Sequence, residues 1–182
     1  MDHVISGVAK FQKEVYPNKK ATFQKLATGQ NPEVLFITCS DSRIDPNLVT
    51  QTDPGELFIC RNAGNIVPPH SNQTGGMTAS IEFAVAALGV SHIVICGHTD
   101  CGAMKGAINP EGLSALPHVK EWLGHCRVAT EVVKERCGHS DLSIDDLEAV
   151  TKENVVQQIQ HLRTHPAVAA KIATGQVKLH GW

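Results

Sequence analysis

A continuous apolar run that leads directly into reactive side chains is the strongest constraint on the fold of this chain. Residues 34–39 read Val-Leu-Phe-Ile-Thr-Cys, and the chain continues as Ser-Asp-Ser-Arg to Arg43. A run with so little polar alternation is typical of a strand buried on both faces of a parallel sheet. A thiol, a carboxylate and a guanidinium directly after such a strand indicate a functional site at its carboxyl end.

The composition is that of an ordinary globular protein. The chain has 182 residues, of which 42% are hydrophobic and 19% charged, and we expect a single domain over 1–182. The net charge of −2 gives no reason to expect a nucleic-acid or membrane partner. The N-terminus lacks the apolar region of a signal peptide, and no stretch approaches the ~20 apolar residues that span a bilayer. We therefore expect a cytoplasmic protein whose six cysteines serve metal binding, catalysis or packing instead of disulfides.

Strand-like and helix-like segments alternate along the chain, which predicts an α/β fold with a mainly parallel central sheet of about four strands flanked by helices. Two helices separated at Pro17-Asn18 form an N-terminal arm over 1–28, which could cover its own sheet or clasp a neighbouring chain. The strands are expected at 34–39, 56–61, 92–96 and 177–180. Further helices are expected from Pro46, at 76–89, after residue 102, and at 116–136, 143–162 and 166–175.

A second apolar run also ends in residues that bind metals. The expected strand at 92–96 leads to His98 and, three residues later, to Cys101. If this strand lies beside the one at 34–39, these two side chains meet Cys39 at the same edge of the sheet. Zinc binds thiolate and imidazole, and three protein ligands leave a fourth position open, as catalytic zinc sites do. The alternative is that both cysteines are small buried hydrophobic residues.

Asp41 and Arg43 follow Cys39 at a spacing that lets both side chains point the same way. A carboxylate beside an arginine stays ionised and oriented. Near a zinc ion, Asp41 could accept a hydrogen bond from water on the metal or occupy the open position itself. Without a metal, the pair would be a structural ion pair or a helix cap.

Taken together, the two motifs resemble the signature of the β-class carbonic anhydrases. The resemblance covers essentially the whole chain, and it implies zinc-dependent, reversible hydration of carbon dioxide to bicarbonate and a proton by attack of a zinc-bound hydroxide. It also implies one Zn²⁺ per chain, held by Cys39, His98 and Cys101. The motifs that carry it are Cys-Ser-Asp-Ser-Arg at 39–43, Arg-Asn-Ala-Gly-Asn at 61–65, Ser-Ile-Glu-Phe-Ala at 80–84, Gly-His-Thr-Asp-Cys-Gly-Ala-Met at 97–104 and Leu-His-Gly-Trp at 179–182.

The resemblance also implies roles for the residues around the metal. Asp41 orients the hydroxide and Arg43 holds Asp41. Two thiolate ligands acidify water less than three imidazoles would, so activity is expected to be favoured at neutral to alkaline pH. Phe36 stands where one subtype of the family carries a tryptophan of an inhibitory bicarbonate site, which favours the open-site subtype. The expected substrate-binding residues are Gln30, Phe58, Ala63, Gly102 and Phe83, the last standing where several relatives carry tyrosine.

Some pocket residues of this family come from a neighbouring subunit, so the resemblance implies a homodimer, with assembly into a tetramer left open. Relatives continue past the equivalent of Gly181-Trp182 into another strand, whereas this sequence ends there. Either the sequence is truncated or the protein lacks that strand, and in both cases the last sheet edge is expected to be unpaired. The sequence also allows three alternative functions: a CS2 or COS hydrolase on the same scaffold, an inactive zinc-bound assembly protein, and a redox protein that uses Cys39 and Cys101.

Overall fold

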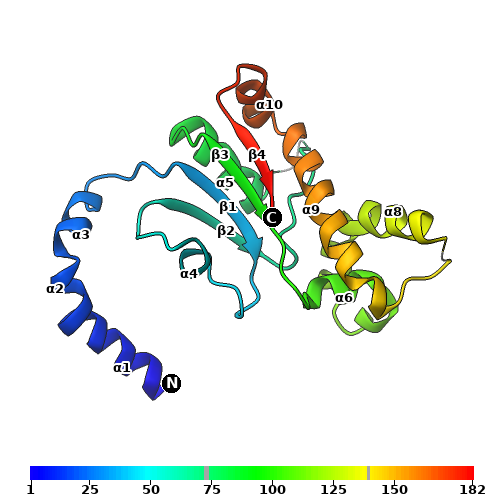
Figure 1. The fold of residues 1–182 in the computed structure, drawn as a ribbon, viewed down its shortest axis with the longest axis horizontal. Coiled ribbons are helices and arrows are strands. Elements are labelled where there is room, and N and C mark those ends of the chain that lie inside the picture. Colours follow the sequence, from blue (N-terminus) through cyan, green and yellow to red (C-terminus); the bar gives the residue numbers. More distant parts are fainter. Residues whose placement is uncertain (72–73, 139) are drawn as a thin grey trace.

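A four-stranded, all-parallel sheet lies at the centre of the structure, a computed structural model that describes residues 1–71, 74–138 and 140–182 (Figure 1). The strand order is β2-β1-β3-β4. The strands are β1 (Val34–Cys39), β2 (Leu57–Asn62), β3 (His92–Cys96) and β4 (Lys178–Gly181). The predicted α/β class and parallel sheet are confirmed. β1 and β3 have the predicted bounds, whereas β2 and β4 each begin and end one residue later than predicted.

The register of the sheet brings the two motifs together. β1 lies between β2 and β3, with Cys39 opposite Asn62 and Thr38 opposite Cys96. The chain therefore leaves β1 at Cys39 and leaves β3 two residues before His98, on adjacent strands and at the same edge of the sheet.

One face of the sheet is covered by helices and forms the main core. The helices on this face are α5 (Gly76–Glu82), α9 (Leu147–Thr164) and α10 (Pro166–Ala173). Alternate strand residues point to one face, so every second side chain of β1 and β3 enters this core. Leu35, Ile37, Ile93 and Ile95 from the strands and Ile81 and Leu162 from the helices are fully buried.

A second helical group lies beyond the carboxyl edge of the sheet, around Met104 and Cys126. It contains α6 (Gly102–Ile108), a 3₁₀ turn (Pro110–Leu113), α7 (Pro117–Leu123) and α8 (Arg127–Cys137). The single helix predicted at 116–136 is wrong, because a 3₁₀ turn at Gly124–Cys126 separates α7 from α8. Glycine has weak helix propensity, and short 3₁₀ turns commonly mark such breaks.

Several helix boundaries follow local signals in the sequence. Asp45 caps α4 (Pro46–Thr50) by accepting a hydrogen bond from the Leu48 N–H at 3.1 Å. The capping box predicted at Ser143 is present, at the start of a 3₁₀ turn (Ile144–Asp146) that leads into α9. Glycines in left-handed backbone conformations follow helix ends. Examples are Gly89, after the π-helical turn Phe83–Ala87 that continues α5, and Gly138, after α8.

The N-terminal segment forms an arm that stands away from the sheet (Figure 1). It comprises α1 (Asp2–Lys10), a π-helical turn (Phe11–Val15), α2 (Tyr16–Asn18) and α3 (Lys20–Leu26). The helix break predicted at Pro17-Asn18 lies one residue later, because helical backbone continues through Asn18 and is interrupted at Lys19, whose φ of −109° and ψ of 12° are not helical. The π turn shifts the hydrogen bonding, with the Tyr16 N–H donating to the Phe11 carbonyl, and Pro17 falls in the first turn of α2, where its missing N–H is tolerated.

None of the helices in the described chain has both the length and the apolar character needed to cross a bilayer.

Candidate metal centre

Three side chains with strong metal-binding groups meet at the carboxyl edge of the sheet. Cys39 ends β1, His98 lies in the loop after β3, and Cys101 immediately precedes α6. One ligand atom from each lies within 4.8 Å of the other two, and the two Sγ atoms are 3.9 Å apart. Ligands of one tetrahedral zinc ion, with Zn–S about 2.3 Å and Zn–N about 2.0 Å, lie at comparable separations. The predicted convergence is confirmed.

The ring of His98 is oriented for metal binding. Its Nδ1 lies 2.9 Å from the Thr99 carbonyl, which fixes the proton on Nδ1 and leaves the lone pair on Nε2. Nε2 is buried and finds no hydrogen-bond partner among the described residues. A buried nitrogen without a partner is costly, so its environment fits a missing ligand such as a metal ion.

The two cysteines are buried, and their thiols interact. Contact with the Cys101 thiol lowers the pKa of Cys39 to about 4, and the Gly64 N–H, 3.4 Å from the Cys39 Sγ, also stabilises the thiolate. The pKa of Cys101 is raised, because a second thiolate beside the first is unfavourable and the site is buried. A cation between them removes this conflict, and a Cys-His-Cys set suits zinc.

Asp41 and Arg43 form a bidentate pair beside the three ligands. Arg43 Nε donates to Asp41 Oδ1 at 2.9 Å, and Arg43 Nη2 donates to Asp41 Oδ2 at 2.7 Å. These hydrogen bonds hold the pKa of the Asp41 carboxyl well below its usual range. Asp41 Oδ2 also lies 3.9 Å from His98 Nε2, so the carboxylate borders the metal position.

Two residues with no predicted role, Arg61 and Asn154, hold the loops of the site. Arg61, at the carboxyl end of β2, donates hydrogen bonds of 2.7–2.9 Å to the carbonyl groups of Cys39, Asp41 and Ile44. From α9, the buried Asn154 donates to the Gly64 carbonyl at 3.0 Å. Arg61 could have been singled out from the sequence as the charged residue of the 61–65 motif. No local pattern, however, connects Asn154 to Gly64, which lies ninety positions earlier.

The expected substrate-binding residues fall into two groups. Ala63, next to the thiol-bound Gly64, and Gly102, next to Cys101, lie at the metal centre and are exposed. Gln30 precedes β1, and Phe58 lies near the start of β2, beside Phe83, with ring centroids 6.0 Å apart. These three residues therefore lie toward the amino-terminal ends of the strands, whereas Cys39 lies at the carboxyl end of β1. Each intervening strand residue adds about 3.3 Å to the separation. Within one chain, the structure does not bring them to the metal centre.

Comparison with known proteins agrees with this geometry. The carbonic anhydrase family matches residues 34–182. A carbonic anhydrase from Pseudomonas aeruginosa is 47% identical over 182 residues, covering all of this chain and 82% of the relative. Carbonic anhydrase 1 from Escherichia coli O157:H7 is 49% identical with the same coverage.

Solved structures show the same fold. The β-carbonic anhydrase CcaA superposes with a TM-score of 0.95 at 41% identity, covering all of this chain and 88% of the other. A tetrameric β-carbonic anhydrase from Sordaria macrospora superposes with a TM-score of 0.83 at 32% identity, covering 99% of this chain and 89% of the other. With its Cys39, His98 and Cys101 zinc site, the chain belongs to the β-class carbonic anhydrase family.

Proposed function

We propose that this chain catalyses the activity of its family, the reversible hydration of carbon dioxide to bicarbonate and a proton. The observation that carries the proposal is the buried convergence of Cys39, His98 and Cys101, with an unpartnered His98 Nε2 and an ionised Asp41 at its border. Zinc bound there supplies Lewis acidity that makes a hydroxide nucleophile available near neutral pH.

The side chains around the metal divide the remaining work between them. Asp41, kept ionised by Arg43, serves as a hydrogen-bond acceptor that orients the attacking oxygen toward carbon dioxide. The Thr99 carbonyl fixes the His98 ring, and the Gly64 N–H stabilises the Cys39 thiolate. Ala63 and Gly102 are small, apolar residues at the rim of the metal site, and such residues suit an uncharged substrate.

The complete pocket needs a second copy of the chain. Gln30, Phe58 and Phe83 lie far from the metal centre of their own chain, and Phe83 is 48% exposed at the side of β2, an edge strand of the sheet. A homodimer that apposes these edges would bring them to the partner's zinc site. The tetrameric Sordaria relative supports oligomeric assembly in this family.

The open-site subtype is proposed from two observations. Phe36 is 1% exposed and packs edge-on against Trp182, with ring centroids 5.8 Å apart. A phenylalanine buried against Trp182 therefore stands where the other subtype carries the tryptophan of its inhibitory site. Asp41 is held by Arg43. Hydration activity is expected to rise from acid to alkaline pH, and a pH–rate profile that stays flat into the acid range would contradict this expectation.

Stopped-flow measurement of carbon dioxide hydration, with a pH indicator and quantified zinc, tests the proposal. The parent protein should hydrate carbon dioxide rapidly with about one zinc per chain, and Cys39→Ala should lose both zinc and activity. Cys137→Ala, which removes an exposed cysteine at the end of α8, is the matched control and should retain both.

Other results of the same experiment favour the alternative functions. Zinc without hydration would favour the inactive assembly protein. Sulfide release from COS or CS2 without hydration would favour that hydrolase, and a Cys39–Cys101 disulfide without zinc would favour a redox protein. The expected cytoplasmic location is a proposal that agrees with the six free thiols.

A further inference from the structure

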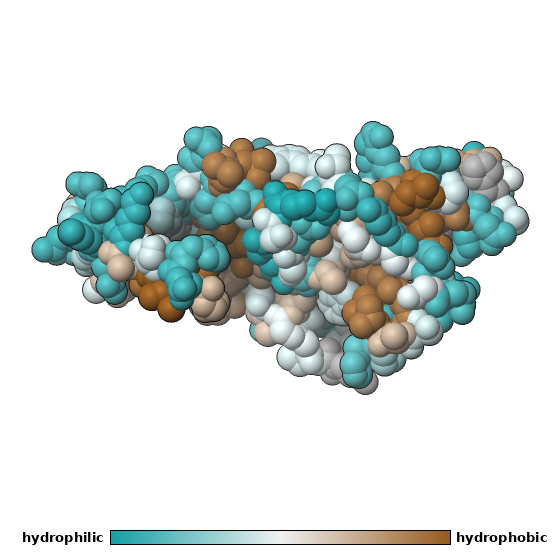
Figure 2. Space-filling model, turned by 90° about the horizontal axis from the view of Figure 1, so that it is seen from below, coloured by the Kyte–Doolittle hydropathy of each residue, from teal (hydrophilic) through white to brown (hydrophobic). Residues whose placement is uncertain are grey.

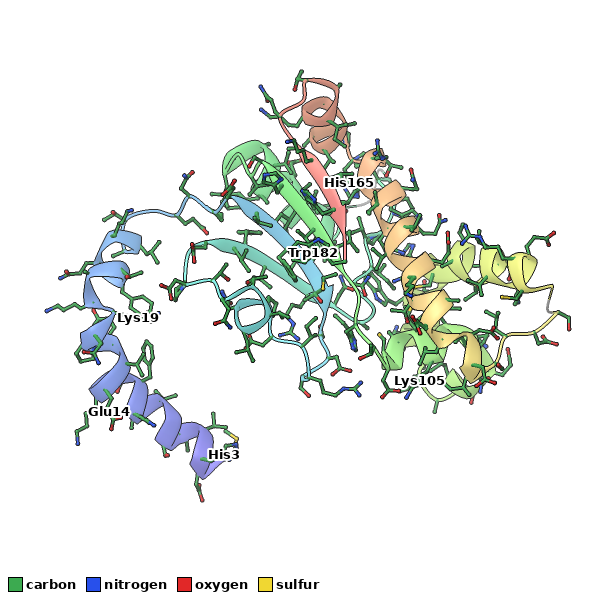
Figure 3. The ribbon with its side chains drawn as sticks, in the orientation of Figure 1. His3, Glu14, Lys19, Lys105, His165 and Trp182 are labelled. Atoms are coloured by element: carbon green, nitrogen blue, oxygen red, sulfur yellow. The ribbon has the colours of Figure 1, made fainter. Side chains whose placement is uncertain are left out.

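Asp100 occupies an unusual place in the zinc-binding loop. It lies between the ligands His98 and Cys101 and has a backbone φ of +54°, a left-handed conformation that asparagine and aspartate tolerate better than most other residues. This turn directs the Asp100 side chain toward Arg43. Lys105, which is labelled in Figure 3, lies on α6. Its ammonium group also pairs with Asp100.

The Arg43 guanidinium is held from both sides. Asp41 accepts hydrogen bonds from Nε and Nη2 on one side. On the other, Nη1 donates to Asp100 Oδ2 at 2.8 Å and Nη2 donates to the Asp100 carbonyl at 2.9 Å. Lys105 binds the remaining carboxylate oxygen, Oδ1, of Asp100. Negative and positive groups therefore alternate from Asp41 to Lys105, and they anchor Arg43 to the same loop that carries two zinc ligands.

This anchoring matters because Asp41 is itself able to bind the metal. Its Oδ2 lies 3.9 Å from the ligating Nε2 of His98, so a small rotation would bring a carboxylate oxygen into the fourth coordination position. Arg43 opposes that rotation by holding both Asp41 oxygens. An arginine bound only to Asp41 could move with it, whereas an arginine fixed by Asp100 cannot.

We propose that Asp100, supported by Lys105, is a positioning residue that keeps the Asp41–Arg43 pair out of the fourth coordination position of the zinc. The inference rests on the proposed function, because it assigns Asp41 its role beside an open metal site. Within the described part of the chain, the Asp100 side chain bonds to Arg43 and Lys105, so it acts on the metal site through Arg43.

Asp100→Asn tests this role with little change in shape. Asparagine accepts the left-handed conformation and keeps one acceptor oxygen, but it removes the charge that pairs with Arg43 and Lys105. We expect kcat for hydration to fall about 2- to 5-fold, the range that an exposed ion pair supports. We also expect zinc transfer to a chromogenic chelator to be slower than in the parent, because Asp41 now reaches the metal.

Matched variants separate positioning from a structural role. Glu148→Gln breaks the Glu148–Lys152 ion pair on α9, whose side chains are 77% and 75% exposed, and should change neither quantity. Lys105→Met should also lower kcat and slow zinc transfer to the chelator, by smaller factors than Asp100→Asn does. Lys105→Arg should keep the kcat and the zinc-transfer rate of the parent. Lys105→Met also provides the test if Asp100→Asn fails to fold.

Reduced kcat with slower zinc release supports the positioning role. Unchanged kcat relative to Glu148→Gln, or reduced kcat with unchanged or faster zinc release, overturns it. If the parent itself does not hydrate carbon dioxide, the proposed function fails, and the zinc-release comparison still decides whether Asp100 keeps Asp41 from the metal.

Discussion

At the scale of the residue, the partner of each ring nitrogen determines what a histidine does in this protein. His98 gives Nδ1 to a carbonyl group and keeps Nε2 for the metal. His161 and His165 share a helical spacing that can bind zinc, yet their rings bind the backbone of another segment. His161 Nδ1 lies 2.7 Å from the Val67 carbonyl, and His165 Nε2 lies 3.0 Å from the Pro68 carbonyl. These two histidines therefore attach the chain beyond β2 to the end of α9.

His165 should make the stability of the protein depend on pH. It is 2% exposed, and burial lowers its pKa, with the neighbouring His70 and His161 adding to this effect and the Pro68 carbonyl opposing it. Between its folded-state pKa and the ordinary value near 6.5, the unfolded chain binds the proton and the folded chain does not, so stability falls as the pH decreases through this range. One such group changes the unfolding free energy by at most about 1.4 kcal/mol per pH unit.

Chemical denaturation at a series of pH values between 7.5 and 5.5 measures this dependence. His165→Gln keeps an N–H donor for the Pro68 carbonyl but does not titrate, so its unfolding free energy should depend less steeply on pH than that of the parent. Equal slopes in the two proteins would contradict the assignment to His165.

At the scale of the element, helix ends depend on single side chains, and helix interiors depend on packing. The capping box at Ser143 was visible in the sequence because it needs only residues three positions apart. The break between α7 and α8 and the π turn before Pro17 were not visible, because apolar periodicity continues across both. Such irregular turns adjust the direction of a helix to its neighbours, and residues outside the helix determine that direction.

Removal of the Ser143 cap should destabilise the start of α9. Its hydroxyl accepts from the Asp145 N–H at 3.2 Å, while Asp146 Oδ2 accepts from the Ser143 N–H at 2.8 Å. Ser143→Ala should lower the unfolding free energy by about 1 kcal/mol. Thermal denaturation checks this value against Ser140→Ala, which removes an exposed hydroxyl that donates to the neighbouring Asp141 carboxylate. Equal melting temperatures for the two variants would show that the cap contributes nothing.

At the scale of the whole molecule, the N-terminal arm is the clearest sign of a partner. Val4, Ile5, Val8 and Phe11 are 39–62% exposed, and α1 has no buried residue. Apolar side chains appear among hydrophilic ones on this arm, at the left of Figure 2. A helix with an uncovered apolar stripe agrees with the proposed homodimer, in which a second copy of the chain covers it.

Charges on this stripe should separate the dimer. Burial of an aliphatic side chain contributes about 1.5–3 kcal/mol, so Ile5→Lys with Val8→Lys should weaken association by more than ~100-fold. Multi-angle light scattering should show a dimeric parent and a monomeric variant, and hydration activity should fall because Gln30, Phe58 and Phe83 no longer reach a partner's site. His3→Lys with Gln12→Lys adds the same charge at exposed polar positions and should remain dimeric. A parent that is monomeric and fully active would refute the shared pocket.

The fold class and the zinc ligands could be predicted from the amino-acid sequence, because both depend on short-range patterns. Continuous apolar runs predicted β1 and β3, and the position of Cys39, His98 and Cys101 directly after them predicted their meeting at one edge of a parallel sheet. An apolar run and the reactive side chains at its end are local properties, which a few consecutive residues show.

The residues that support the site, and those that do not reach it, are set by contacts between distant segments of the chain. Arg61 holds the loop after β1 across the sheet, Asn154 holds Gly64 from α9, and Asp100 holds Arg43 from the loop after β3. Phe58 and Phe83 proved to be remote from the metal centre of their own chain. These relations join segments that are far apart in sequence, and the packing of helices on the sheet fixes their distances, so no local pattern could express them.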